Sequence, residues 1–211
     1  MKRIVPPMLP SELTADCDFA AMAEREERIE GVSFMELQRE ENELDDLHVH
    51  ESAFVRCSFA GSRMTNGNYV DVTFSGCDFS NCDLSKSAFR RVSFFQCKLM
   101  GADLINCLLK DVNFEDCQMG YINFADTKVQ KSGFFDCRMP DSIFLNCQIE
   151  ALFRGSELTS ATFQRTPLAG IDFTSCGIDG LIVTLPDLQG LRVNGLQAVG
   201  LSKLLGLVIA E

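Results

Sequence analysis

The sequence lacks most of the side chains and all of the short motifs on which common enzymes depend. It has two histidines, His48 and His50, and both lie in an acidic segment. It contains no GxSxG, HExxH, phosphate-loop or dinucleotide-binding pattern. Alternation on one strand face would allow the two histidines to form a metal pair, but an exposed polar edge is the simpler interpretation. We therefore expect no enzyme, no cofactor and no metal site.

Long apolar runs and basic clusters are missing as well. The apolar run after Lys2 and Arg3 is too short for a signal peptide, and no transmembrane stretch follows. The net charge is −11, and residues 11–52 hold 14 acidic but only three basic residues. Without Lys and Arg patches to contact phosphates, direct binding to nucleic acid is not expected. We expect a cytoplasmic protein.

The cysteines reveal a repeat of five residues. All ten occupy one column of this repeat, with Cys176 joining after a slip of one residue. Two positions later lies a second column of large apolar residues: Phe54, Phe59, Met64, Tyr69, Phe74, Phe79, Leu84, Phe89, Phe94, Leu99, Leu104, Leu109, Phe114, Met119, Phe124, Val129, Phe134, Met139, Phe144 and Ile149. A strict period of this length indicates units that stack on copies of themselves to bury their apolar sides.

A period of five fits neither a helix nor a flat strand. It fits a chain that runs extended, turns, and repeats on the next side, with Gly, Asn or Asp at many turns. Four units close a square coil of 20 residues, which predicts an all-β right-handed quadrilateral β-helix, a solenoid architecture. The phenylalanines that lie 20 residues apart should then stack as a ladder inside the solenoid: Phe54, Phe74, Phe94, Phe114 and Phe134. Cysteines in the small column should be free structural residues rather than disulfides or metal ligands.

The ends of the chain depart from the repeat. Residues 1–16 contain three prolines and should form an irregular arm. The β-helix should span residues 17–193, with degenerate acidic coils over 17–53, where Ala20 to Glu30 could instead form a short helix, and with a register slip near 150–152. Residues 194–211 should form a small helix and a short strand. This module could cap the solenoid internally, but we favour a homodimer interface, formed by Val199, Leu201, Leu204, Leu205 and Val208.

One outward face is the candidate surface for a protein partner. It combines the aromatics Phe95 and Phe135 with nearby carboxylates. The predicted acidic patch consists of Glu115, Asp116 and Asp136, with Asp126 and Asp141 added at the adjoining corners, and the acidic segment Glu40 to Asp46 is a second candidate. Two alternatives stay open: a scaffolding solenoid that binds its partner through the apolar part of this face, or a merely solvated face.

Several units resemble the pentapeptide-repeat family. They include Cys77-Asp78-Phe79-Ser80-Asn81 and Ala102-Asp103-Leu104-Ile105-Asn106. Size, an acidic first portion and an apolar C-terminal module look like the Qnr and MfpA quinolone-resistance proteins, above all the chromosomally encoded Qnr-like type of Gram-positive bacteria. That resemblance implies a dimeric DNA mimic that binds DNA gyrase, and also topoisomerase IV, and protects the enzyme from fluoroquinolones or inhibits it. The projecting loops of plasmid-type Qnr proteins are absent between Phe54 and Ile149.

Overall fold

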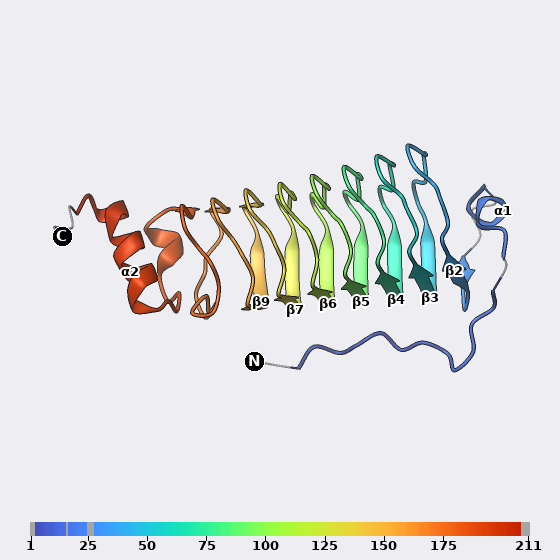
Figure 1. The fold of residues 1–211 in the computed structure, drawn as a ribbon, viewed down its shortest axis with the longest axis horizontal. Coiled ribbons are helices and arrows are strands. Elements are labelled where there is room, and N and C mark those ends of the chain that lie inside the picture. Colours follow the sequence, from blue (N-terminus) through green and yellow to red (C-terminus); the bar gives the residue numbers. More distant parts are fainter. Residues whose placement is uncertain (1–2, 16, 25–27, 208–211) are drawn as a thin grey trace.

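The computed structural model of this chain describes residues 3–15, 17–24 and 28–207. They form a β-solenoid of about eight turns with parallel strands and a short C-terminal helix (Figure 1). The solenoid predicted from the five-residue period is therefore confirmed. Equivalent strands lie side by side along the long axis of the molecule, so one sheet runs along most of the rod (Figure 1).

The main sheet contains eight parallel strands, most of which pair with the strand one coil further along the chain. Its strands are β1 (Ile29–Glu30), β2 (Ser33–Met35), β3 (His48–Val55), β4 (Asn68–Ser75), β5 (Ala88–Phe95), β6 (Leu108–Glu115), β7 (Lys128–Phe135) and β9 (Gln148–Arg154). A second sheet contains β8 (Ile143–Leu145), β10 (Thr162–Gln164) and β11 (Ile182–Val183). The helical elements are α1 (Phe19–Glu24), η1 (Pro186–Leu188), α2 (Gly195–Ser202) and η2 (Lys203–Leu205).

The corners of the coils explain the turn-forming residues of the repeat. Paired residues are 20 positions apart, as in Phe94 and Phe114. From residue 36 to residue 146, every fifth residue has a positive φ. Gly, Asn and Asp adopt this left-handed conformation most readily, which is why they recur there. Tyr121 (φ 59°) and Lys131 (φ 47°) adopt it too, so stacking imposes the turn even where the residue type does not favour it.

The large column points inward and forms ladders of stacked aromatic rings. The longest ladder has ring centroids 4.8 to 5.2 Å apart between neighbours and consists of Phe34, Phe54, Phe74, Phe94, Phe114, Phe134 and Phe153. All seven side chains are buried. The predicted phenylalanine ladder is therefore confirmed, and it continues at both ends.

The small column also points inward, and its side chains bond to the neighbouring coil. The Cys97 thiol donates to the carbonyl of Phe74 at 3.4 Å, and the Thr127 hydroxyl donates to the carbonyl of Leu104 at 2.5 Å. A short side chain with one donor fits this position, so Cys, Ser and Thr can replace one another. All ten cysteines are free. Burial raises the pKa of the Cys82 thiol to about 12, which keeps this thiol protonated.

The register shifts by one residue between β7 and β9. Gln130 pairs with Glu150, whereas Ser132 pairs with Ala151, which leaves the corner residue Lys131 between the two pairs. This is where the sequence shortens the spacing of the large column. The inward columns recover at once, because the next ring of the ladder still stacks on the one before it.

The first coils combine a helix with partial strands. After α1, the strands β1 and β2 both pair with β3. Thr14 forms an isolated parallel bridge with Val32. Residues 3–13, which contain no helix or strand, return along the outside of the solenoid as an extended arm (Figure 1).

The C-terminal module covers the other end of the rod. Asn194 caps α2, because its side chain accepts a hydrogen bond from the amide of Gln197 while the Gln197 side chain accepts one from the amide of Asn194. The helix tightens into η2 and ends at Gly206, which has φ 74°. Of the short strand predicted at the C-terminus, Leu207 shows no regular structure, and Val208 and Ile209 lie outside the described residues.

Candidate partner-binding surfaces

Each coil presents four faces, separated by its corner residues. In the coil that contains β6, we number the faces 1 to 4 by the inward residues at their centres, Leu109, Phe114, Met119 and Phe124. The corners that follow faces 1 to 4 are occupied by Asp111, Asp116, Tyr121 and Asp126. On either side of each inward residue, one outward residue repeats every 20 positions, so every face carries two outward columns.

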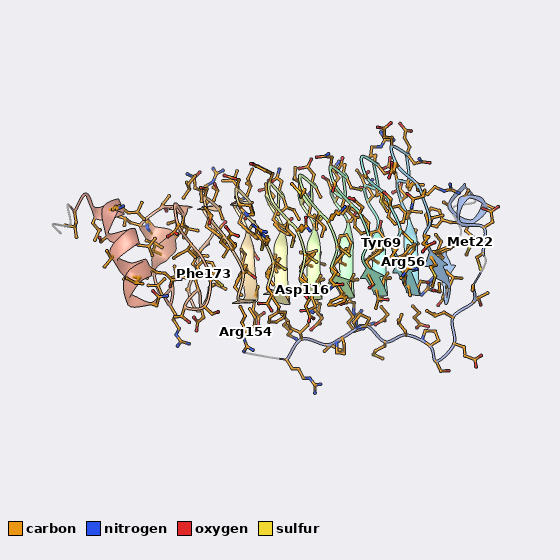
Figure 2. All side chains as sticks on the ribbon, in the orientation of Figure 1. Met22, Arg56, Tyr69, Asp116, Arg154 and Phe173 are labelled. Atoms are coloured by element: carbon orange, nitrogen blue, oxygen red, sulfur yellow. The ribbon has the colours of Figure 1, made fainter. Side chains whose placement is uncertain are left out.

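Three residues of the predicted acidic patch lie together on face 2 and its corner. Glu115 ends β6, and its register partners in the adjoining strands are Phe95 and Phe135. Asp116 and Asp136 occupy the next corner, one coil apart, with Asp116 labelled in Figure 2. All three carboxylates are exposed, and none forms an ion pair within the described residues.

The other two residues of that patch lie on different edges of the rod. Asp141 follows Asp136 by five residues and therefore occupies the next corner, between faces 3 and 4. Asp126 lies ten residues from both Asp116 and Asp136, which is half a coil, so it occupies the diagonally opposite corner. The expectation that Asp126 and Asp141 both lie at corners adjoining face 2 is wrong, because the 20-residue coil places Asp141 one corner further round the rod and Asp126 at the opposite corner.

Face 4 carries a longer acidic surface, and only its first end, with Glu43 and Asp45, lies in the segment singled out from the sequence. Its first outward column is a continuous series of bridged residues, Glu43, Arg63, Asp83, Asp103 and Asn123. Arg63 forms ion pairs with Glu43 at 3.3 Å and with the neighbouring Asp45 at 2.7 Å. Its positive charge is therefore paired with these two residues and not with Asp83. Asp83 and Asp103 lie one coil apart and have no cation partner in the part of the chain described.

Asp126 extends this acidic surface to the adjoining corner. A shallow depression there is lined by Thr65, Asp83, Ser85, Lys86, Ile105, Asn106 and Asp126. The side-chain amide of Asn123 donates to Asp103 at 3.2 Å. The sequence could have revealed face 4 if the residues just before the large column had been compared at intervals of 20, because this comparison aligns Glu43, Asp83 and Asp103.

The rod is not acidic all round. Face 1, which shares the Asp126 corner with face 4, carries Arg90, Lys110 and Lys128 in its outward columns. A basic surface therefore lies next to the acidic one. A positively charged partner would therefore be oriented as well as attracted, because face 4 attracts it and face 1 repels it.

The C-terminal module exposes apolar side chains beyond the end of the solenoid. Val199, Leu204 and Leu205 of the predicted dimer interface are exposed, and Val208 lies outside the described residues. Leu201 differs from the prediction, because it packs against the core and helps to close the last coil. Leu196, which the sequence analysis did not include, is 86% exposed.

The two histidines do not form a metal site with other ligands. His48 is exposed on β3, and Nδ1 of His50 lies 2.5 Å from Nη2 of Arg28. Burial and the Arg28 guanidinium lower the pKa of His50. Within the described residues, no group of three or more His, Cys, Asp or Glu is placed to hold a metal ion. No helix in that part of the chain is long and apolar enough to cross a membrane.

Comparison with known proteins agrees with the fold. No curated protein sequence matches the chain. One solved structure, a trypsin-treated form of QnrB1, a plasmid-mediated fluoroquinolone resistance protein, is 17% identical, and the match covers 94% of this chain and 97% of that one with a TM-score of 0.44. HetL, a pentapeptide repeat protein involved in heterocyst differentiation regulation in the cyanobacterium Nostoc sp. strain PCC 7120, is 11% identical over 77% of this chain and 87% of its own, with a TM-score of 0.39.

A third structure, Rfr23 from the cyanobacterium Cyanothece 51142, is 12% identical, covering 83% of this chain and 97% of its own, with a TM-score of 0.19. At these values the structural likenesses carry no argument about function. The family model described as Pentapeptide repeat region matches residues 68–144 and 89–173, which together span half of the 211 residues. The chain belongs to the pentapeptide-repeat family.

Proposed function

We propose that this protein is a non-catalytic, cytoplasmic DNA mimic that binds DNA gyrase, with topoisomerase IV as a second target, and protects the enzyme from fluoroquinolones or modulates its activity. The observation that carries the proposal is the acidic surface of face 4 on a stiff rod, where the half-buried Asp83 and Asp103 and the exposed corner residue Asp126 have no cation partner within the described residues. The narrower assignment to the Qnr and MfpA group, and to its chromosomal Gram-positive type, rests on the sequence resemblance and belongs to the same proposal.

The spacing of charge on face 4 suits a surface that normally grips phosphates. Asp83 and Asp103 are separated by one coil, about 4.8 Å, and Asp126 adds a third carboxylate at the corner. Because the coils are cross-linked by backbone hydrogen bonds, these carboxylates are held in place before binding. A partner therefore loses little entropy in ordering them.

The charge density limits how the mimicry can operate. Duplex DNA carries about one charge per 1.7 Å of axis. Carboxylates one coil apart give a single column only about one charge per 4.8 Å. The protein is a sparse mimic, so binding should depend on a matched patch rather than on net charge and should weaken as salt is added.

A homodimer through the C-terminal module would lengthen the mimic, and we include it in the proposal. The side chains of Leu196 and Leu205 are exposed beyond the end of the solenoid, and burying them against a second copy of the chain would remove apolar surface from water. Leu196→Glu together with Leu205→Glu should shift the mass in sedimentation equilibrium from dimer to monomer, while the solenoid stays folded. A wild-type chain that sediments as a monomer at micromolar concentration would contradict the dimer.

Gyrase supercoiling at an inhibitory fluoroquinolone concentration, titrated with this protein, tests the function. The wild-type protein should restore supercoiling, or inhibit the enzyme without drug. The pair Asp83→Asn and Asp103→Asn should weaken either effect, whereas the charge-matched control pair Glu150→Gln and Asp179→Asn should not. If the wild-type protein has no effect with or without drug, the proposal is wrong.

A separate set decides between the two acidic surfaces. Glu115→Gln, Asp116→Asn and Asp136→Asn remove the carboxylates of face 2 and its corner, which remain the alternative contact. Loss of activity in this set alone would move the contact from face 4 to face 2.

One observation supports the alternative of a scaffolding solenoid with an apolar contact. Phe95 is 38% exposed on face 2, and Phe135 lies two coils further along the same column. Binding through these rings would be nearly independent of salt and lost in Phe95→Ser with Phe135→Ser. The extent of the apolar surface is small, because the ring of Phe135 already lies over Gly133.

A further inference from the structure

The N-terminal arm lies along faces 1 and 2, over a strip of surface that we call the groove and that the acidic-surface proposal does not use. The floor is the outward column that precedes the large residues of face 2, and its members are small: Ala53, Thr73, Ser93, Asn113 and Gly133. A side chain at position 133 would collide with Ile4 of the arm and with the ring of Phe135. The groove is therefore shaped to accept a chain lying along the rod.

Two buried carboxylates on the rim of this groove bind the backbone of the arm. The amide of Met8 donates to Oδ1 of Asp71 at 2.9 Å, and the amide of Val5 donates to Oδ1 of Asp111 at 3.1 Å. Asp71 and Asp111 are 4% and 6% exposed, whereas the other aspartates at corners along the rod are exposed. Two carboxylates placed to accept backbone amides indicate that the groove recognises an extended main chain.

The spacing of these contacts matches one backbone conformation. Polyproline II rises about 3.1 Å per residue, so three residues span about 9.3 Å. Asp71 and Asp111 are two coils apart, which is about 9.6 Å. Pro6 and Pro7 lie between the two donor residues and favour this conformation. They also lack amide hydrogens, so the segment between the donors leaves no backbone N–H without a partner.

Asp71 is held in the charged form that this contact needs. Burial opposes its charge, but hydrogen bonds from Arg91 and from the Met8 amide keep the pKa of Asp71 below its ordinary value. The guanidinium of Arg91 binds both carboxylate oxygens of Asp71. A charged acceptor makes a stronger hydrogen bond to an amide than a neutral one.

The arm itself is held by few contacts. Between residues 3 and 13 it forms no strand pairing, and its first bridge to the solenoid is at Thr14. Val5 and Met8, which donate their amides to the groove, are 42% and 62% exposed, and the arm residues described between 3 and 12 are half-buried at most. Segments with few buried contacts open at low cost in free energy, so an exchangeable arm is the physical expectation.

We propose that this groove is a binding site for a proline-rich, extended segment of a partner protein, and that the N-terminal arm occupies it as a built-in competitor. The partner segment would present two backbone amides three residues apart to Asp71 and Asp111. Small side chains along the groove floor would admit its backbone. The arm must leave before the partner binds.

Hydrogen exchange of the full chain tests the recognition. The amides of Val5 and Met8 should exchange more slowly than the other amides of the arm, and Asp111→Gly should speed exchange at Val5 about ten-fold by removing its acceptor. Asp116→Gly is the matched control, because both corners have positive φ (56° and 53°) and only Asp111 contacts the arm. Unprotected Val5 and Met8 amides in the wild-type chain would overturn the proposal.

Binding in trans tests the competition. A fluorescent peptide with the sequence of residues 3–13 should bind full-length protein carrying Pro6→Gly and Pro7→Gly about ten-fold more tightly than the wild type, because the resident arm then costs more entropy to order. Adding Asp111→Gly should reverse this gain, and adding Asp116→Gly should not. The same peptide with N-methylated Val5 and Met8 lacks both donor amides and should bind more weakly than the unmodified peptide. Peptide binding that is absent, or indifferent to Asp111, would refute the proposal.

Discussion

Two adjacent phenylalanines provide a direct test of the inward column. Phe94 is buried, and its ring stacks on Phe74 at 5.0 Å and on Phe114 at 4.8 Å. Replacing a buried Phe by Ala costs about 3–5 kcal/mol. Stacked aromatic pairs add about 0.5–1.5 kcal/mol each. Because Phe94→Ala removes two such pairs from a ladder that cannot collapse without shifting its coils, we expect the loss in the free energy of unfolding to lie at the upper end of the Phe→Ala range, about 4–5 kcal/mol.

The assay is urea unfolding followed by circular dichroism, with Phe95→Ala as the control. Phe95 follows Phe94 directly in β5 but points outward, so its removal should cost less than about 1 kcal/mol. With a urea m-value of about 3 kcal/mol/M, the midpoint of Phe94→Ala should fall by about 1.5 M. Equal midpoints for the two variants would refute the assignment of the large column to the interior.

Three further outcomes are expected. Tyr69→Phe should raise the free energy of unfolding by about 1 kcal/mol, because the buried Tyr69 hydroxyl has no hydrogen-bond partner; the exposed Tyr121→Phe is the control, and an unchanged midpoint for Tyr69→Phe would contradict the reasoning. Asp71 has a lowered pKa, so its stabilising contribution is present above its ordinary value of 3.8 and is lost as pH falls through the folded value; urea midpoints of Asp71→Asn should therefore fall less steeply below pH 4 than those of the wild type. A thiol reagent should label Cys17, which is half-buried, and leave the other nine cysteines unlabelled until denaturant is added; rapid labelling of several thiols would show that the small column is not sealed.

The fold was predictable because the signal for it is local and repeated. Each five-residue unit needs one small and one large inward residue and a corner residue, and this pattern recurs from Phe54 to Ile149. The one-residue slip after Ile149 was predictable for the same reason, since a spacing of four stands out in a strict period of five. Where the repeat is degenerate, before residue 53, the sequence left helix and coil open, and the structure contains both.

The candidate surfaces were predicted only in part. Glu115, Asp116 and Asp136 do adjoin one another, because residues one coil apart or next in sequence must do so. Asp126 was assigned to the same patch although half a coil separates it from Asp116 and Asp136. Leu201 was assigned to the dimer interface, but the helix turns it towards the last coil and leaves Leu196 exposed instead. A helix of eight residues has too few turns for its sequence to show which apolar side faces the protein.

By itself, the sequence determined the solenoid, its inward ladders, its corners and its free cysteines, since each depends on spacings of five and 20 residues along the chain. The tertiary structure alone decided where the arm lies and which carboxylates it buries. Val5 meets Asp111 across 106 positions of sequence, and Met8 meets Asp71 across 63. No periodic signal connects such residues. Their contact follows from the match between the rise of an extended proline-rich chain and the spacing of stacked coils, which exists only once the coils have stacked.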